Sequence, residues 1–157
     1  MPGRVAIRRT TGRDPAFSTL TGRLDAELWF RYGEIQAAYA VHNQFVPETA
    51  VVAYVGELAV GCACWRPYDS TTAELKRMFV ETAHRWAGIG KAIVNEIEAW
   101  AIELGYTMVV LETGIRQPEA VGLYESRGYT MIDNYGAYAG LANSVCMRKR
   151  LRRPTPP

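Results

Sequence analysis

The sequence lacks the features that mark secreted, membrane-spanning and disulfide-linked proteins. Its 157 residues contain no run of eighteen or more apolar residues, so no membrane-spanning helix is predicted. Residues 1–9 have no apolar core of signal-peptide length, which favours a cytoplasmic protein with no membrane partner. Only three cysteines occur, Cys62, Cys64 and Cys146, and their odd number and unpaired spacing favour free thiols over disulfides.

An excess of charge of one sign is also missing. The 18 Lys and Arg residues against 16 Asp and Glu give a formal net charge of +2, which requires no acidic partner. Basic residues cluster between 148 and 153, but aromatic residues do not alternate with them as they do on single-strand-binding surfaces. We therefore expect no nucleic acid partner. No residues at metal-ligand spacing stand out, so no metal is predicted.

The length and the 48% of apolar residues fit one folded domain with one core. We expect this domain to span residues 1–151 and a flexible tail to follow over 152–157. A short strand is predicted at 5–8. Apolar residues then recur at helical spacing from Leu24, and Gly33 ends or bends that helix. The segment 33–48 has no clean period and is expected to be a loop with some helix.

Strands and helices then follow in a mixed order. Apolar, β-branched runs at 50–55 and 58–65 flank Gly56 and Glu57, which predicts a hairpin. A third strand at 72–80 extends this hairpin into an antiparallel meander. The remaining predicted elements are an amphipathic helix from 88 to 105, a strand at 108–112, a helix at 118–127, and strands at 129–133 and 144–151. This order predicts a mixed α/β sheet.

The stretch 80–91, V-E-T-A-H-R-W-A-G-I-G-K, joins the third meander strand to the amphipathic helix. Gly88 and Gly90 let the backbone approach a ligand, and the free amides of a helix N-terminus favour a phosphate or pyrophosphate. The spacing matches neither a nucleotide P-loop nor a dinucleotide fingerprint. From these residues alone, a glycine-assisted turn with no ligand is an equally good interpretation.

Two segments in fixed order carry a family resemblance. ELKRMFVETAHRWAGIGKAIV followed by LETGIRQPEAVGLYESRGY resembles the GNAT acyltransferase superfamily, and the resemblance extends from about Leu24 to Leu151. It implies a central, mostly antiparallel sheet of six to seven strands, flanked by helices and splayed between the fourth and fifth strands. It also implies an N-acetyltransferase that uses acetyl-coenzyme A as co-substrate and needs no metal.

The resemblance assigns the coenzyme-binding residues. The pyrophosphate would lie on the backbone amides of Arg85, Trp86, Ala87, Gly88, Ile89, Gly90 and Lys91. The pantetheine arm would pair with the backbone of Met78, Phe79 and Val80, where free ladder groups remain. Gln117 stands where many members carry Asn, and we expect its amide to keep a hydrogen-bonding role.

Catalytic roles are implied for two residues. Tyr124 matches the family's tyrosine near the sulfur, where a phenol protonates the departing thiolate; without the resemblance it would be interpreted as a core tyrosine. Glu74 stands where some members carry a base. The alternative for Glu74, held equally open, is an exposed charge at the start of a strand.

Three more charges are candidates for substrate contacts. Lys76 and Arg77 are adjacent in a central strand, so we expect them to point to opposite faces and each to need a partner. Internal ion pairs with Glu74 or Glu112 are one solution and a substrate carboxylate is another. Arg77 and Glu112 are the candidate substrate-binding residues.

The acceptor is expected to be the primary amine of a small molecule, attacked directly in a ternary complex. A protein or peptide acceptor is the first alternative, and a non-catalytic acyl-coenzyme A-binding module is the second. The non-catalytic module would have no use for Tyr124 or Glu74. A homodimer is left open.

Overall fold

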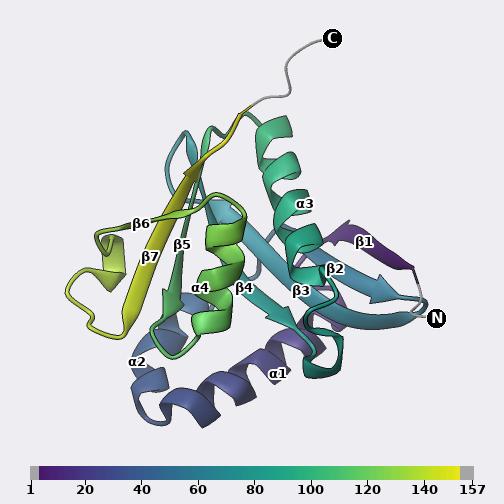
Figure 1. Ribbon diagram of the computed structural model, residues 1–157, viewed down its shortest axis with the longest axis horizontal. Coiled ribbons are helices and arrows are strands. Elements are labelled where there is room, and N and C mark those ends of the chain that lie inside the picture. The colour runs from purple at the N-terminus through teal and green to yellow at the C-terminus, as the bar shows by residue number, and fades with distance from the viewer. Residues whose placement is uncertain (1–3, 153–157) are drawn as a thin grey trace.

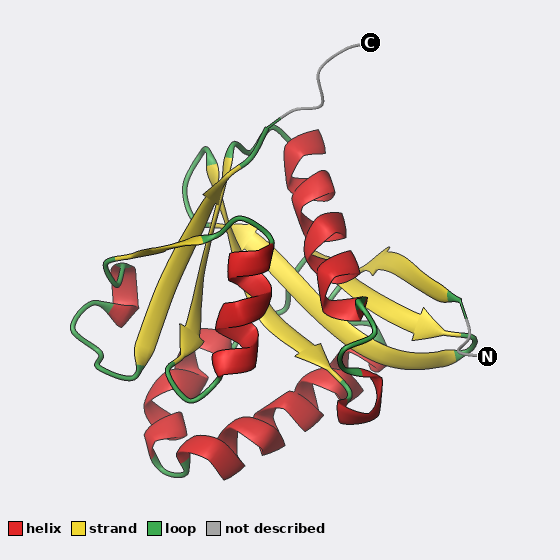
Figure 2. Ribbon diagram, viewed as in Figure 1, coloured by secondary structure: helices red, strands yellow, loops and turns green. Residues whose placement is uncertain are grey.

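A seven-stranded sheet runs through the molecule in the order β1-β2-β3-β4-β5-β7-β6, with helices on both faces (Figures 1 and 2). The computed structural model describes residues 4–152, so the predicted tail beyond Arg152 lies outside the described residues. The strands are β1 (Val5–Thr10), β2 (Thr49–Val55), β3 (Leu58–Pro67), β4 (Thr72–Val80), β5 (Met108–Gly114), β6 (Thr130–Ile132) and β7 (Ser144–Arg150). The helices are α1 (Pro15–Tyr32), α2 (Ile35–Ala40), α3 (Ile89–Glu103) and α4 (Pro118–Ser126).

The first half of the sheet is the predicted antiparallel meander. β2 and β3 join through the Gly56-Glu57 turn, and β3 pairs with β4. Gly56 adopts a φ of 61°, which glycine tolerates and which a tight hairpin turn requires. The mixed α/β fold class is confirmed.

Helix α1 begins earlier than its apolar pattern from Leu24 indicates. Asp14 caps it by accepting a hydrogen bond from the Ala16 amide, and Pro15 occupies the first helical position. Gly33 ends α1 as predicted, with a φ of 56°. The ambiguous segment that follows contains the short helix α2 and a 3₁₀ turn at Val41–Asn43, in agreement with a loop that has some helix.

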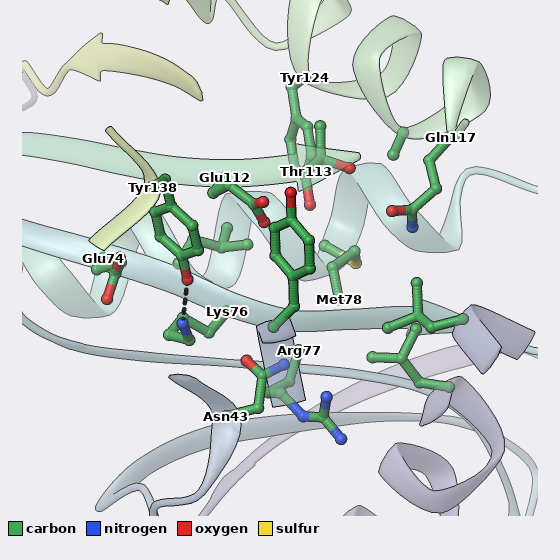
Figure 3. Close-up of a pocket in the computed structure, with 15 residues that line it drawn as sticks. Asn43, Glu74, Lys76, Arg77, Met78, Glu112, Thr113, Gln117, Tyr124 and Tyr138 are labelled. Atoms are coloured by element: carbon green, nitrogen blue, oxygen red, sulfur yellow. Dashed lines mark hydrogen bonds between the residues drawn. The ribbon is translucent and has the colours of Figure 1, made fainter. Parts of the chain in front are cut away.

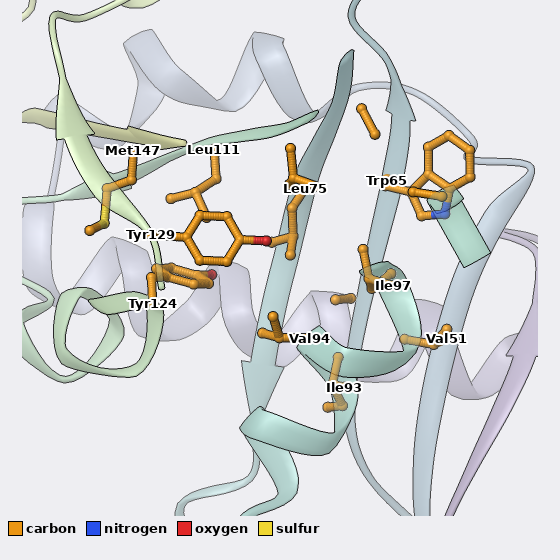
Figure 4. Close-up of a cluster of buried hydrophobic side chains, with 14 of the residues drawn as sticks. Val51, Trp65, Leu75, Ile93, Val94, Ile97, Leu111, Tyr124, Tyr129 and Met147 are labelled. Carbon is orange, nitrogen blue, oxygen red and sulfur yellow. The ribbon is translucent and has the colours of Figure 1, made fainter. Parts of the chain in front are cut away.

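Two apolar layers enclose the sheet. On one face α3 packs Ile93, Val94 and Ile97 against the strands, beside the rings of Tyr124 and Tyr129 (Figure 4). The opposite face packs against α1, whose buried side chains join apolar residues of β2, β3 and β4 (Phe17, Leu20, Leu24, Ala50, Val52, Cys62, Cys64 and Phe79). Burial of apolar side chains on both faces therefore stabilises the sheet. Each Å² of apolar surface removed from water contributes about 25 cal/mol to the free energy of folding.

The second half of the sheet parts from the first after a short contact. β4 and β5 are parallel and pair only from Thr72–Met108 to Leu75–Leu111. Beyond Leu75 the two strands diverge, whereas β5 pairs with β7 along its whole length (Figure 1). The splay predicted between the fourth and fifth strands is confirmed.

The predicted opposite orientation of Lys76 and Arg77 is wrong. The β3–β4 register shifts between Cys62 and Cys64, so β4 carries an extra residue there, and Arg77 adopts a φ of 61°. A bulge of this kind interrupts the alternation of side chains. Lys76 and Arg77 consequently lie on the same side of β4, the side that faces α1 and α2.

Gly114, at the end of β5, provides a test of this packing. A Cβ there would overlap the Tyr32 hydroxyl, which accepts a hydrogen bond from the Arg116 amide. We expect Gly114→Ala to lower the free energy of unfolding by about 1–3 kcal/mol through overpacking. Gly122→Ala is the matched control, because its Cβ would meet nothing within 4 Å and α4 should gain up to about 1 kcal/mol. Urea unfolding measures both, and equal changes would contradict the packing described.

Candidate functional site

A cavity of about 100 Å³ lies where β4 and β5 separate, between α1, α2 and α4 (Figure 3). Its lining combines charged groups with phenols and a few apolar side chains. The lining residues are Leu24, Leu28, Tyr39, Asn43, Glu74, Leu75, Lys76, Arg77, Met78, Glu112, Thr113, Gln117, Ala120, Tyr124 and Tyr138. The splay therefore brings together the candidate catalytic and substrate-binding side chains, from β4, β5 and α4.

Glu74 is only 3% exposed, so its interpretation as an exposed charge is wrong. Its carboxylate accepts a hydrogen bond from Arg66 Nε at 2.9 Å and another from the Tyr135 hydroxyl at 2.7 Å. The contact with Arg66 is also a salt bridge, because it joins opposite charges. These two donors hold the buried carboxylate in one orientation.

Arg77 and Lys76 find different partners from those expected. The Arg77 guanidinium forms a salt bridge with Asp25 of α1 at 2.8 Å and donates to the Thr21 carbonyl. Lys76 is 7% exposed, and its Nζ donates to the Tyr138 hydroxyl at 2.8 Å. Burial lowers the pKa of Lys76, against the opposing charge of Glu74.

Glu112 lies across the cavity from these residues on β5. The Ser144 hydroxyl donates to its Oε2 atom at 2.7 Å. Burial raises the pKa of Glu112, although this hydrogen bond and the charge of Lys76 act in the opposite direction. The carboxyl group thus binds its proton more tightly than an exposed glutamate does.

Tyr124 projects from α4 into the same cavity and is 4% exposed. Its ring packs edge-on against Tyr129, with ring centroids 5.7 Å apart. Burial raises the pKa of Tyr124, and the charge of Glu112 adds to this effect. The phenol therefore keeps its proton at neutral pH and is able to donate it.

The glycine-containing turn lies beyond the end of β4, outside the cavity lining. Gly88 has a φ of 80° and precedes α3, whose N-terminus has no side-chain cap. Trp86 has a φ of 69° and is 94% exposed. Gly90 instead contacts another helix, because a Cβ there would lie 3.0 Å from Leu123 of α4. The turn thus presents uncapped amides to its surroundings, and Ala87, Ile89 and Lys91 lie within or just after it.

The remaining coenzyme candidates border this region. Arg85 is held by the Val80 carbonyl at 2.9 Å and by Glu27 at 2.8 Å. Met78 lines the cavity, whereas the Phe79 side chain packs toward α1. Gln117 precedes α4, and its side-chain oxygen accepts a hydrogen bond from the Gly114 amide at 3.1 Å.

A second cavity of about 320 Å³ borders the first, and Glu74 and Tyr138 line both. Its other walls are His42, Arg66, Pro67, Tyr68, Tyr135, Gly136 and Ala137. The cavity roles of Tyr135 and Tyr138 were not predicted from the sequence. Both lie in the irregular 135–143 segment, where no periodicity predicts the direction of a side chain.

None of the helices in residues 4–152 is both long and apolar enough to cross a membrane. Within the same range, no three His, Cys, Asp or Glu side chains gather in a way that would hold a metal ion.

The profile of the acetyltransferase (GNAT) family matches residues 21–129, and the chain belongs to this family. Human N-acetyltransferase 8 is 39% identical over 83 residues, which cover 50% of this chain and 37% of that relative. The chain spans 37 to 55% of the length of three curated relatives that it matches.

Solved structures share the fold over nearly the whole chain. A Klebsiella pneumoniae protein described as a candidate acyl-CoA N-acyltransferase is 27% identical, with a TM-score of 0.80 over 94% of this chain and 98% of that one. An Elizabethkingia anophelis GNAT acetyltransferase, solved with acetyl-CoA bound, is 17% identical, with a TM-score of 0.67 over 94% and 98% of the two chains.

The raised pKa of Glu112 predicts how stability depends on pH. The folded protein retains this proton where the unfolded chain, with a glutamate pKa of about 4.3, has released it. The stability of the wild type relative to Glu112→Gln should therefore fall as pH rises from about 4 through the raised pKa, and then level off.

Urea unfolding from pH 4 to 8 measures this difference. Glu57→Gln, in the exposed β2–β3 turn, controls for the loss of a surface carboxylate. A wild type that gains stability over Glu112→Gln as pH rises would contradict the burial effect.

Proposed function

We propose that this protein is an N-acetyltransferase that moves an acetyl group from acetyl-coenzyme A directly to the primary amine of a small molecule. The observation that carries this proposal is the cavity at the β4–β5 splay, where unpaired β4 backbone, the Tyr124 phenol and buried carboxylates meet. Family membership supports the reaction class.

The residues present suit acetyl-coenzyme A. Past Leu75, the edge of β4 that faces β5 has no strand partner in the described chain, so its backbone groups, apart from the Val80 carbonyl that accepts from Arg85, are available to the amides of the pantetheine arm. The uncapped α3 N-terminus and the left-handed Gly88 offer amides and a favourable helix dipole to the pyrophosphate. The coenzyme would supply the activated acetyl thioester.

The side chains around the cavity divide the proton transfers between them. Tyr124 is protonated and is proposed to donate to the departing thiolate, and the proton that the nitrogen loses after its attack restores the phenol. A β4 amide would stabilise the negative charge that develops on the thioester oxygen. Glu74 is proposed to take the proton of the acceptor ammonium through water, because its own oxygens already accept two hydrogen bonds.

The segments that wall the cavity on several sides favour a small acceptor over a protein chain. Leu24 and Leu28 of α1 and Tyr39 of α2 line it from one side, and Tyr138 lines it from the β6–β7 connection. A peptide acceptor would need an open groove across these segments. A non-catalytic coenzyme-binding module is the less favoured alternative, because it leaves the phenol and the carboxylates without a role.

Coenzyme binding should stabilise the protein. We expect acetyl-coenzyme A at a hundredfold excess over its dissociation constant to add about 2.7 kcal/mol, measured by thermal unfolding. Gly88→Val should remove this gain, because a side chain would obstruct the amides that face the phosphates. Gly56→Val is the matched control: it introduces a similar positive-φ strain in the β2–β3 turn, away from the site. Stabilisation by ATP but not by acetyl-coenzyme A would refute the proposal.

Tyr124→Phe should lower kcat on the order of a hundredfold or more while leaving coenzyme affinity nearly unchanged, since the lost proton donation acts only in the transition state. Phenylalanine preserves the packing against Tyr129. Tyr106→Phe, which alters a phenol that packs on Trp65 outside the cavity, serves as the control. Thiol-release kinetics beside calorimetry measure both quantities. Full turnover by Tyr124→Phe would remove Tyr124 from the mechanism.

A further inference from the structure

We infer that the acceptor carries a carboxylate beside its amine, and that Lys76 and Tyr138 bind this carboxylate. The inference rests on the proposed acetyl transfer and names the substrate class for the same site. It starts from the only buried lysine among residues 4–152, a cation that reaches a cavity without an ion-pair partner.

Lys76 lines the cavity from β4, immediately before the bulge at Arg77. Its side chain is covered by Phe45 and Tyr138, with Nζ 5.9 and 5.5 Å from the two ring centroids. The nearby carboxylates are already engaged, since Glu74 binds Arg66 and Tyr135, and Glu112 binds Ser144. Within the described chain, no carboxylate lies within salt-bridge distance of Lys76.

An ammonium group has three hydrogen-bond donors, and the hydrogen bond to Tyr138 uses one of them. A buried charge without a counter-ion is unfavourable, so an anion that enters the cavity would be bound strongly. The Tyr138 oxygen accepts from Lys76, which leaves its own hydroxyl proton available to a ligand. The ammonium and the phenol together present donors to the two oxygens of a carboxylate.

The arrangement of residues around the cavity indicates where the carboxylate and the amine of such an acceptor would lie. Figure 3 shows Lys76, Tyr138 and Glu74 at one end and Gln117 at the other, with Glu112 between them. Met78 and Tyr124, which are assigned to the coenzyme side, lie toward the Gln117 end. A carboxylate at Lys76 would leave the neighbouring amine directed toward the acetyl group.

The second cavity provides space for the rest of the acceptor. Glu74 and Tyr138 line both cavities, so a ligand bound at Tyr138 has access to each. The second cavity is walled by Tyr68 and Tyr135, whose rings pack edge-on at 5.2 Å, and by Tyr138, whose ring lies 5.7 Å from that of Tyr135. Such walls suit an apolar or aromatic group. The inferred acceptor class is an α-amino acid with an apolar or aromatic side group.

The test pairs a variant with matched acceptors. Each amino acid, for example phenylalanine or leucine, is compared with its amide, which has the same amine and side group but no carboxylate. We expect Lys76→Met to raise KM for the acids by about ten- to a hundredfold, the usual range for a lost charged hydrogen bond, and to leave KM for the amides within about twofold. The amines of the acid and the amide differ in pKa, but this difference does not affect the result, because KM for each acceptor is compared only between the wild type and the variant.

Three further variants isolate the effect. Arg150→Met removes the same charge from an exposed position and should change neither KM. Tyr138→Phe should raise KM for the acids alone and by less than Lys76→Met. Tyr54→Phe, which alters a phenol on β2 outside both cavities, is its control. If Lys76→Met instead lowers kcat equally for acids and amides, Lys76 acts on the amine proton and the inference is wrong.

Binding of the products supplies a readout that does not need turnover. With free coenzyme A present, N-acetylated amino acids should raise Tm for the wild type, and Lys76→Met should lose this shift. No shift with any N-acetylated amino acid would overturn the inference. Acetylation of plain amines or peptides but of no amino acid would also overturn it, while the proposed acetyl transfer would stand. No stabilisation by acetyl-coenzyme A and no thiol release would instead refute the proposed function.

Discussion

The short pairing of β4 with β5 is the constraint on which the rest of this structure depends. Four residues of each strand share a ladder, and the strands then diverge. Backbone groups inside a protein need partners, so the free edge of β4 beyond Leu75 calls for a ligand or water where a strand would normally lie. The divergence also opens the cavity and admits Tyr124 from α4 and Glu112 from β5 to the same space. Backbone donors and titratable side chains therefore meet because a sheet is left incomplete.

The bulge at Arg77 decides which charges reach that space. In a regular strand Lys76 would face α1 and Arg77 would face the apolar layer under α3, where a guanidinium has no partner. The extra residue keeps Met78 against that layer and turns Arg77 toward Asp25. The cost is a non-glycine residue at a φ of 61°, which is of order 1–3 kcal/mol. Avoiding an unpaired buried charge offsets a cost of this size.

Much of this arrangement could be predicted from local sequence. The β2–β3 hairpin, the start of α3 after Gly88 and the splay follow from turn residues, periodicity and the resemblance to the GNAT family. The predictions that were wrong concern side chains whose positions depend on contacts between residues distant in the sequence. Glu74 is buried because Tyr135, 61 positions away, covers it, and no local pattern signals that contact. The orientation of Arg77 failed because strict alternation does not hold across a bulge. Local rules thus predicted the elements, but not the pairing of charges between them.

Those pairings also join the glycine-containing turn to the cavity. Arg85, at the start of the turn, binds Glu27 of α1; Glu27 binds Arg31, and Arg31 binds Glu119 of α4. Burial alone would raise the pKa of Glu27, but the Arg85 and Arg31 guanidinium groups outweigh it and hold that pKa below its usual value. A single, partly exposed ion pair of this kind contributes little to stability. A chain of alternating charges, however, ties the turn, α1 and α4 to one another. Because α4 carries Tyr124, the network links the position of the phenol to that of the turn.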